Sequence, residues 1–317
     1  MQGFETIVTS IIKLGLAMLI GFVCLKTKYI TKEQNDGMSR IIVRVTLPIL
    51  VVTSLTKLDL DYEKIINSFQ VLIVSLIVIA VLYMTGVAMA KISRMEKAKA
   101  SMHQCMACFG NVVFMAFPLI EALYGAEGLL YAMIYELAND AFLWTIGVYN
   151  LNSNTKEKKS FSGNLKKVLN PGTIAFAVAF VMMAFKLKFT GAVGEVLGGI
   201  GGTTSYMSMF FIGGTLALVD FRHIYKRVWI FILTLIKMII IPIALIFILK
   251  LLNFNEISGA VVVLQAAMPI STVLAILAAE YKGDVLYCVE GVFVSHLLGL
   301  VTLPFIFYMM NAIQNIL

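Results

Sequence analysis

Runs of about 20 apolar residues recur along almost the whole chain, separated by short polar segments. A run of that length is what an α-helix needs to cross the hydrocarbon core of a bilayer. Only 14% of the 317 residues are charged, whereas a soluble domain has about a quarter. The sequence therefore predicts an all-α polytopic membrane protein, since spanning backbone must satisfy its own hydrogen bonds.

Counting the apolar runs predicts ten transmembrane helices. Their spans are residues 4–25, 40–56, 68–90, 100–123, 128–150, 170–187, 193–219, 227–250, 258–280 and 285–313. A polar, lysine-rich loop divides them into two sets of five, and an odd number per set makes the two halves face opposite ways, as an inverted repeat requires. We therefore expect a first repeat at 1–150, a loop at 151–169 and a second repeat at 170–317.

The basic residues favour one orientation in the cell membrane. Under the positive-inside rule, Lys and Arg collect in short cytoplasmic loops. They are concentrated after the odd-numbered spans, including the loop at 151–169. The opposite loops hold only Lys57, Lys64, Lys186, Lys188 and Lys250. We expect that loop inside the cytoplasm and both termini outside it, and we read the net charge of +7 as a topology signal rather than as nucleic-acid binding.

Two spans carry a proline in the middle of an apolar segment, and both are predicted to be interrupted there. The first segment runs from Cys108 to Pro118 and the second from Leu264 to Thr272. Proline removes a backbone donor and clashes with the preceding turn. Because freed backbone groups survive in a bilayer only where protein or a cavity satisfies them, paired interruptions in two halves point to a transporter's midplane binding site.

The first interruption offers Gly110, Asn111 and Pro118 as substrate-binding residues. Asn111 lies about two turns before Pro118, on nearly the same helix face. Its amide has two donors and an acceptor, which suits a carboxylate or an open backbone segment. The alternative is an amide that links two helices.

The second interruption offers Gln265, Pro269, Ser271 and Thr272, which either bind a substrate or satisfy the freed carbonyls. The half-helix ends also act without side chains, because their N-termini favour an anion and their C-termini a cation.

The fifth span carries Glu136, Asn139 and Asp140 on one helix face, with Lys237 in the eighth span as a partner for the carboxylates. This group is either a proton or cation coupling site, or a buried network that holds the core together. His296 raises the same alternatives, since a histidine titrates near neutral pH. Two more basic residues, Lys13 and Arg44, lie inside predicted spans, where a charge normally faces a protein interior or cavity.

Other functional classes find little support. No zinc-protease or nucleophile-elbow motif is present, so we do not expect an enzyme. No polar stretch is long enough for a soluble nucleotide-binding domain. The four cysteines lack a matching ligand set, so we expect no metal and no cofactor.

Six segments in this order resemble the auxin efflux carrier family, whose bacterial members include malonate-type carriers. They are Val45-Thr46-Leu47-Pro48, Gly110-Asn111 with Phe117-Pro118, Asn170-Pro171, Gln265-Ala266-Ala267-Met268-Pro269, Ala278-Ala279-Glu280-Tyr281 and Leu303-Pro304. The likeness covers nearly the whole chain.

This resemblance implies ten helices in two inverted five-helix repeats, with broken fourth and ninth helices that cross near the midplane, as in bile-acid sodium symporters. It also implies that helices 1, 2, 6 and 7 form a scaffold and the others a moving transport domain. Plant members bind a carboxylate near the fourth-helix asparagine, which corresponds to Asn111. Association of two copies through the scaffold helices is a further expectation.

We therefore expect a secondary active transporter that moves a small organic anion, a mono- or dicarboxylate, by alternating access. The alternatives are a ligand-binding membrane sensor on the same fold and a sodium-coupled symporter. Coupling is open between a proton, an uncoupled uniport and sodium, for which Gln265, Ser271 and Thr272 are the side-chain donors. We favour the proton, because Glu136 and Asp140 put two titratable groups on one helix.

Overall fold

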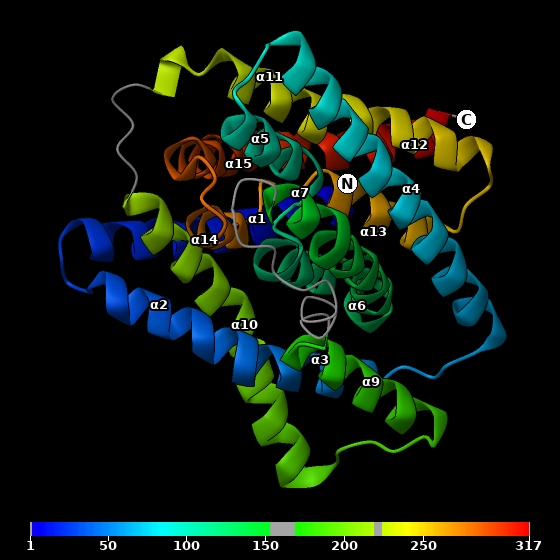
Figure 1. Ribbon diagram of the computed structural model, residues 1–317. Coiled ribbons are helices and arrows are strands. Elements are labelled where there is room, and N and C mark those ends of the chain that lie inside the picture. The colour runs from blue at the N-terminus through cyan, green and yellow to red at the C-terminus, as the bar shows by residue number, and fades with distance from the viewer. Residues whose placement is uncertain (1, 153–168, 219–223, 317) are drawn as a thin grey trace. The chain divides into compact units, whose positions relative to one another are not determined.

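The computed structural model describes residues 2–152, 169–218 and 224–316 (Figure 1). Helices make up these described residues almost entirely, and no strand occurs among them beyond an isolated bridge. Five runs of helix in this part of the chain are long and apolar enough to cross a membrane. These runs are Lys32–Leu55, Tyr62–Ile92, Val112–Asn152, Val228–Leu251 and Val285–Ile313. The all-helical membrane character is therefore confirmed, whereas ten crossings and an inverted repeat stay predictions.

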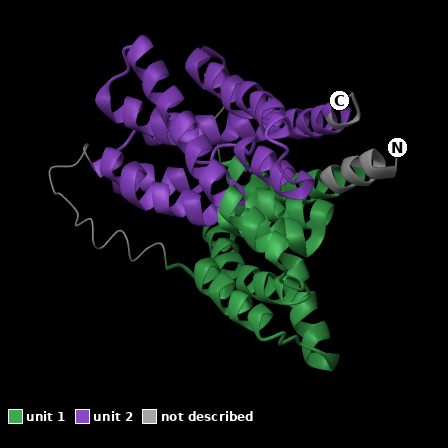
Figure 2. Ribbon diagram, turned by 90° about the vertical axis from the view of Figure 1, so that its right-hand side faces the viewer, with its two compact units in different colours: residues 1–70, 113–134, 169–218 green, residues 71–112, 135–168, 219–317 purple. Residues whose placement is uncertain are grey.

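The chain divides into two compact units, which Figure 2 shows in green and purple. Unit 1 comprises Met1–Gln70, Val113–Ile134 and Leu169–Leu218, and unit 2 comprises Val71–Val112, Tyr135–Val168 and Val219–Leu317. Each unit combines segments from both predicted repeats. The predicted loop at 151–169 lies mostly outside the described residues.

Unit 1 holds the four spans that the resemblance assigns to a scaffold. Its helices are α1 (Gln2–Lys26), α2 (Lys32–Ile41), α3 (Leu47–Leu55), α9 (Pro171–Ala184) and α10 (Gly191–Ala217), with the starts of α4 (Tyr62–Ile92) and α6 (Phe117–Phe142). α10 packs against α1, α2 and α3.

Small residues let α10 approach its neighbours closely. A Cβ added at Gly213 would overlap the Met18 carbonyl of α1, and one at Gly214 would overlap the Asn35 side chain of α2. Asn35 in turn donates from Nδ2 to the Phe211 carbonyl at 3.3 Å. Gly202, on the same helix, has open space beside it. Gly213 and Gly214 thus serve helix packing, as small residues do in other membrane helices, whereas Gly202 makes no such contact.

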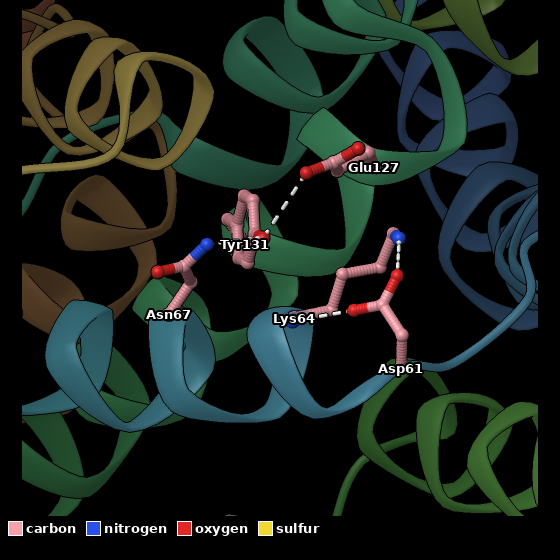
Figure 3. A network of polar contacts seen from close by, with 5 residues as sticks. All are labelled: Asp61, Lys64, Asn67, Glu127 and Tyr131. Atoms are coloured by element: carbon pink, nitrogen blue, oxygen red, sulfur yellow. Dashed lines mark hydrogen bonds and ion pairs between the residues drawn. The ribbon is translucent and has the colours of Figure 1, made fainter.

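A polar network within unit 1 joins the start of α4 to α6 (Figure 3). α6 bends sharply at Gly125, whose φ of 60° suits a residue without a Cβ. After the bend, the Tyr131 hydroxyl donates to Glu127 at 3.1 Å and lies 3.4 Å from the Asn67 amide. Asp61 pairs with Lys64, and that hydrogen bond lowers the pKa of the Asp61 carboxyl. The bend divides α6 between the two predicted spans 100–123 and 128–150.

Two charged side chains of unit 1 do not face a packed interior. Lys13 and Arg44 are both exposed. Arg44 borders a largely apolar cavity of about 530 Å³ between α3, α9 and α10. The expectation that a charge within a span faces a protein interior or a cavity therefore holds for Arg44, which borders this cavity, but not for Lys13. Arg44 lies near the predicted cytoplasmic end of its span, where a long basic side chain can extend towards water.

Unit 2 holds the remaining helices. They are the ends of α4 and α6, α5 (Lys97–Cys108), α7 (Val148–Asn152), α11 (Val228–Leu235), α12 (Ile241–Leu251), α13 (Glu256–Ala266), α14 (Val273–Glu280) and α15 (Val285–Ile316), with the 3₁₀ turn η5 (Ile224–Lys226) and the π segment η3 (Leu143–Gly147). α15 packs against α5, α11, α12, α13 and α14.

Three prolines are accommodated by short π-helical segments rather than by breaks. The segments η1 (Ile42–Thr46), η2 (Val112–Ala116) and η6 (Ile236–Ile240) each end two residues before a proline, namely Pro48, Pro118 and Pro242. A wider turn keeps the proline ring clear of the carbonyl four residues earlier, so the helix continues.

Candidate functional site

Two non-helical segments of unit 2 interrupt its apolar helices. α5 ends at Cys108, the backbone is extended at Phe109, and helix resumes at Val112. α13 ends at Ala266 and helix resumes at Val273, with Pro269 inside the gap. Both interruptions were predicted, but the first does not lie at its proline. Pro118 sits in the first turn of α6, in unit 1, where η2 accommodates it.

The two non-helical segments pair with each other as an antiparallel bridge between Gly110 and Ile270. The Asn111 N–H donates to the Pro269 carbonyl at 2.7 Å, and the Ser271 N–H donates to the Phe109 carbonyl at 3.1 Å. Each segment thereby satisfies backbone groups that the other leaves open, which is the condition for non-helical backbone at membrane depth.

Glycine permits this close approach. A Cβ at Gly110 would lie 3.1 Å from the Cβ of Met268, tighter than ordinary contact. A third element completes the pairing, because the Ser295 hydroxyl of α15 accepts from the Ile270 N–H at 3.0 Å. Sequence reasoning missed Ser295, and its hydroxyl alone carries no signal that distinguishes it from a packing residue.

Asn111 meets His296 at this point. Its Nδ2 lies 2.9 Å from Nε2 of His296, and the two side chains are 2% and 0% exposed. The other ring nitrogen, Nδ1, lies 2.8 Å from the Val292 carbonyl. A carbonyl only accepts, so in the neutral ring Nδ1 carries the proton. Nε2 then has a free lone pair and accepts from the Asn111 amide.

Lys237 is buried, with 1% of its surface exposed, and lies in η6. Its ammonium donates to the Ala107 carbonyl at 3.0 Å, in the last turn of α5. The contact seen for Lys237 is thus with the end of α5, and its partnership with the carboxylates of α6 stays a prediction. The physical reason for this contact is the helix end, where open carbonyls and the negative end of the dipole attract a cation.

The carboxylates of α6 form a group of their own. The Asn139 amide donates to Glu136 at 3.1 Å, and Asp140 lies close enough to Glu136 to act on it electrostatically. Asn139 and Asp140 are buried, and Glu136 is partly buried. The shared helix face was predicted correctly, and Glu136 is bonded there by Asn139, whereas the bond of Asn111 in the described structure goes to His296.

The remaining predicted residues line the second interruption. Gln265 is buried in the last turn of α13, and Ser271 is partly buried. Thr272 is buried at the start of α14 and makes no side-chain capping bond there. The first N–H groups of that helix therefore carry no side-chain cap.

Unit 2 also contains polar contacts that sequence reasoning missed. Arg227 donates to Glu290 at 2.7 Å, and Nδ1 of His103 lies 2.8 Å from the Tyr287 hydroxyl. These partners come from segments far apart in the chain, so residue spacing carries no signal of them.

The sequence of this chain is similar to those of membrane transport proteins. The membrane transport protein family matches residues 6–307. An uncharacterized transporter of Methanothermobacter thermautotrophicus is 24% identical over 303 residues, covering 93% of this chain and 95% of the relative. The uncharacterized transporter YfdV of Escherichia coli K12 is 23% identical over 273 residues, covering 84% and 85%. The chain belongs to the membrane transport protein family, which is the auxin efflux carrier family.

Proposed function

We propose that this protein is a secondary active transporter that moves a small organic anion, a mono- or dicarboxylate, across the cell membrane by alternating access. Its termini lie outside the cytoplasm and the loop at 151–169 inside it. The scaffold comprises the spans 4–25, 40–56, 170–187 and 193–219, and the moving part carries Asn111.

The observation that carries this proposal is the bridge between Gly110 and Ile270. Non-helical backbone is costly in a bilayer and persists where it is held by protein or lines a ligand path. Here two such segments come from distant parts of a transporter-family chain and meet within one unit. Side chains with donors lie directly on them, foremost Asn111.

An anion suits this place better than a cation. α14 begins at Val273, and its N-terminal end projects partial positive charge without a side-chain cap. The amide of Asn111 and the ammonium of Lys237 add donors at the first interruption. A carboxylate is the small anion whose oxygens match such donors.

Proton coupling is the form of energy supply that the titratable groups of unit 2 favour. Glu136 and Asp140 are the candidates on α6, where the Asn139 amide donates to Glu136, and His296 is the candidate on α15. Sodium coupling through oxygens of Gln265, Ser271 and Thr272 and an uncoupled uniport are the alternatives that transport assays separate.

Proteoliposomes test the proposal directly. We expect internal acetate, malonate or succinate to drive counterflow of the same labelled anion, and Asn111→Ala to reduce it. If all three anions bind saturably but none shows counterflow, the protein is a sensor and not a transporter. Uptake that requires a sodium gradient would identify sodium, instead of the proton, as the coupling ion.

A further inference from the structure

We propose that His296 sets the orientation of the Asn111 amide and thereby links proton binding to anion binding at the interruption. The link to anion binding rests on the proposed function. The orientation of the Asn111 amide rests on the two hydrogen bonds of the His296 ring alone. His296 acts through Asn111, so it is a positioning residue.

The neutral ring holds the amide in one orientation. Nδ1 donates to the Val292 carbonyl at 2.8 Å, so Nε2 must accept. The group 2.9 Å away must therefore be the NH₂ of Asn111. In this state a donor of the amide is committed to the ring.

Protonation reverses the requirement. A proton on Nε2 turns that nitrogen into a donor, while Nδ1 keeps its bond to Val292. The NH₂ of Asn111 then faces another donor, which is unfavourable, and a half-turn of the planar amide presents Oδ1 instead. The same rotation moves Nδ2, with both of its donors, to the side away from His296. The protonated state thus offers hydrogen-bond donors where the neutral state offers an acceptor.

The ring of His296 bonds only uncharged groups, the Val292 carbonyl and the Asn111 amide, among the described residues. The helices packed against α15 carry these ionisable residues: Lys97, Lys99, His103, Cys105 and Cys108 on α5, Lys237 on η6, Lys250 on α12, Glu256 on α13 and Glu280 on α14, with Tyr287, Cys288, Glu290 and Tyr308 on α15 itself. His103 and Lys99 contact Tyr287, Lys237 and Lys250 donate to carbonyls, and Glu290 pairs with Arg227. Among the described residues, none of these forms a hydrogen bond or ion pair with His296.

The direction of coupling follows from this geometry. An anion binds better to the state with Nδ2 turned away from His296, which is the protonated state. By linkage, a bound anion also favours the protonated ring by the same factor. Proton and anion therefore bind together, as symport in either direction requires.

Binding measurements on the purified protein test the linkage, with malonate as the probe. We expect affinity to rise about ten- to hundredfold as pH falls through the titration of His296, the worth of a hydrogen bond to a charged group. His296→Gln, whose amide neither titrates nor fixes its partner, should lose this pH dependence. His103→Gln is the matched control, a buried histidine of the same unit bonded to Tyr287, and should keep it. Because malonate itself titrates, the slopes are compared between proteins, and a pH slope as large in His296→Gln as in wild type and His103→Gln overturns the proposal.

A second measurement does not depend on a ligand or on that variant. In protein carrying His103→Gln and His223→Gln, His296 is the remaining histidine, since the sequence has three. Nitrogen-15 NMR of the labelled ring should show the Nδ1-protonated neutral form, and acidification should shift the Asn111 side-chain signals together with those of the ring. A neutral ring protonated on Nε2 would refute the proposal even if malonate bound. Asn111 signals that do not shift when the ring titrates would refute it as well. Absence of malonate binding with the expected spectra would count against the substrate alone.

Discussion

The side-chain amide of Asn111 lies 2.9 Å from Nε2 of His296, although 185 residues separate them in the chain. Both side chains are buried at the point where the two helix interruptions meet. A substrate that bonds to Asn111 has to share or replace this contact. The pair therefore connects a residue suited to bind an anion with a residue suited to bind a proton.

Replacement of Asn111 by alanine should weaken carboxylate binding about ten- to hundredfold, because a hydrogen bond to a charged group is worth about 1.5–3 kcal/mol. Titration calorimetry of the purified variant with malonate measures the loss. Asn150→Ala is the matched control, since the Asn150 amide also bonds another side chain of unit 2, Gln104, at 2.6 Å. Equal affinity in Asn111→Ala and wild type would assign Asn111 to helix packing.

Coupling should depend on His296 rather than on the carboxylates of α6. We expect His296→Gln to lose uptake driven by a pH gradient while keeping exchange at equal pH. Asp140→Asn and Glu136→Gln should keep gradient-driven uptake, because the two ring nitrogens of His296 bond Val292 and Asn111. Flux into proteoliposomes with and without the gradient provides the measurement. The reverse pattern would place coupling on Glu136 and Asp140.

The orientation of the chain can be tested by labelling. Ser160→Cys lies in the basic loop and Lys57→Cys in an opposite loop, both in a background that carries Cys24→Ser, because Cys24 is the partly exposed native cysteine among those described. An impermeant thiol reagent applied to intact cells should label position 57 and not position 160. Permeabilised cells should label both. Labelling of position 160 in intact cells would invert the topology.

The close contact between α1 and α10 predicts a position-specific cost of a single methyl group. Gly213→Ala would drive a Cβ into the backbone carbonyl of Met18, which cannot move aside, and should destabilise the fold by about 1–3 kcal/mol. Gly202→Ala, on the same helix, meets open space and should leave stability within about 0.5 kcal/mol of wild type. Thermal unfolding in detergent compares the two. Equal losses would refute the packing role of Gly213.

The Arg227–Glu290 pair should respond unequally to loss of either partner. Arg227→Met leaves the Glu290 carboxylate, whose side chain is 3% exposed, without its cation and should cost about 3 kcal/mol. Glu290→Gln leaves an arginine whose side chain is 30% exposed, and water can solvate it in part. Its cost should therefore be smaller. Chemical unfolding of both variants gives the ranking, and a larger loss in Glu290→Gln would contradict it.

Helix content and the existence of both interruptions followed from the sequence because these properties are local. Helical hydrogen bonds join residues four apart, and apolar runs report which segments can cross a bilayer. The proline at 269 marks its interruption correctly. Pro118 misplaced the first interruption by several residues, because a π-helical segment accommodates this proline without a break in the helix. Sequence spacing does not distinguish a proline that breaks a helix from one that is accommodated.

Contacts between distant segments depended on the tertiary structure. Charge alone predicts carboxylate partners for Lys237, and packing places its ammonium at the open end of α5, 130 residues away in sequence. The bridge at Gly110 and the bond from Asn111 to His296 arise in the same way. The sequence by itself thus determined the all-helical membrane class and the family, and it supplied the candidate site residues. Only the folded chain decided which of them meet, because partners far apart in sequence are selected by packing and by the need to satisfy buried polar groups.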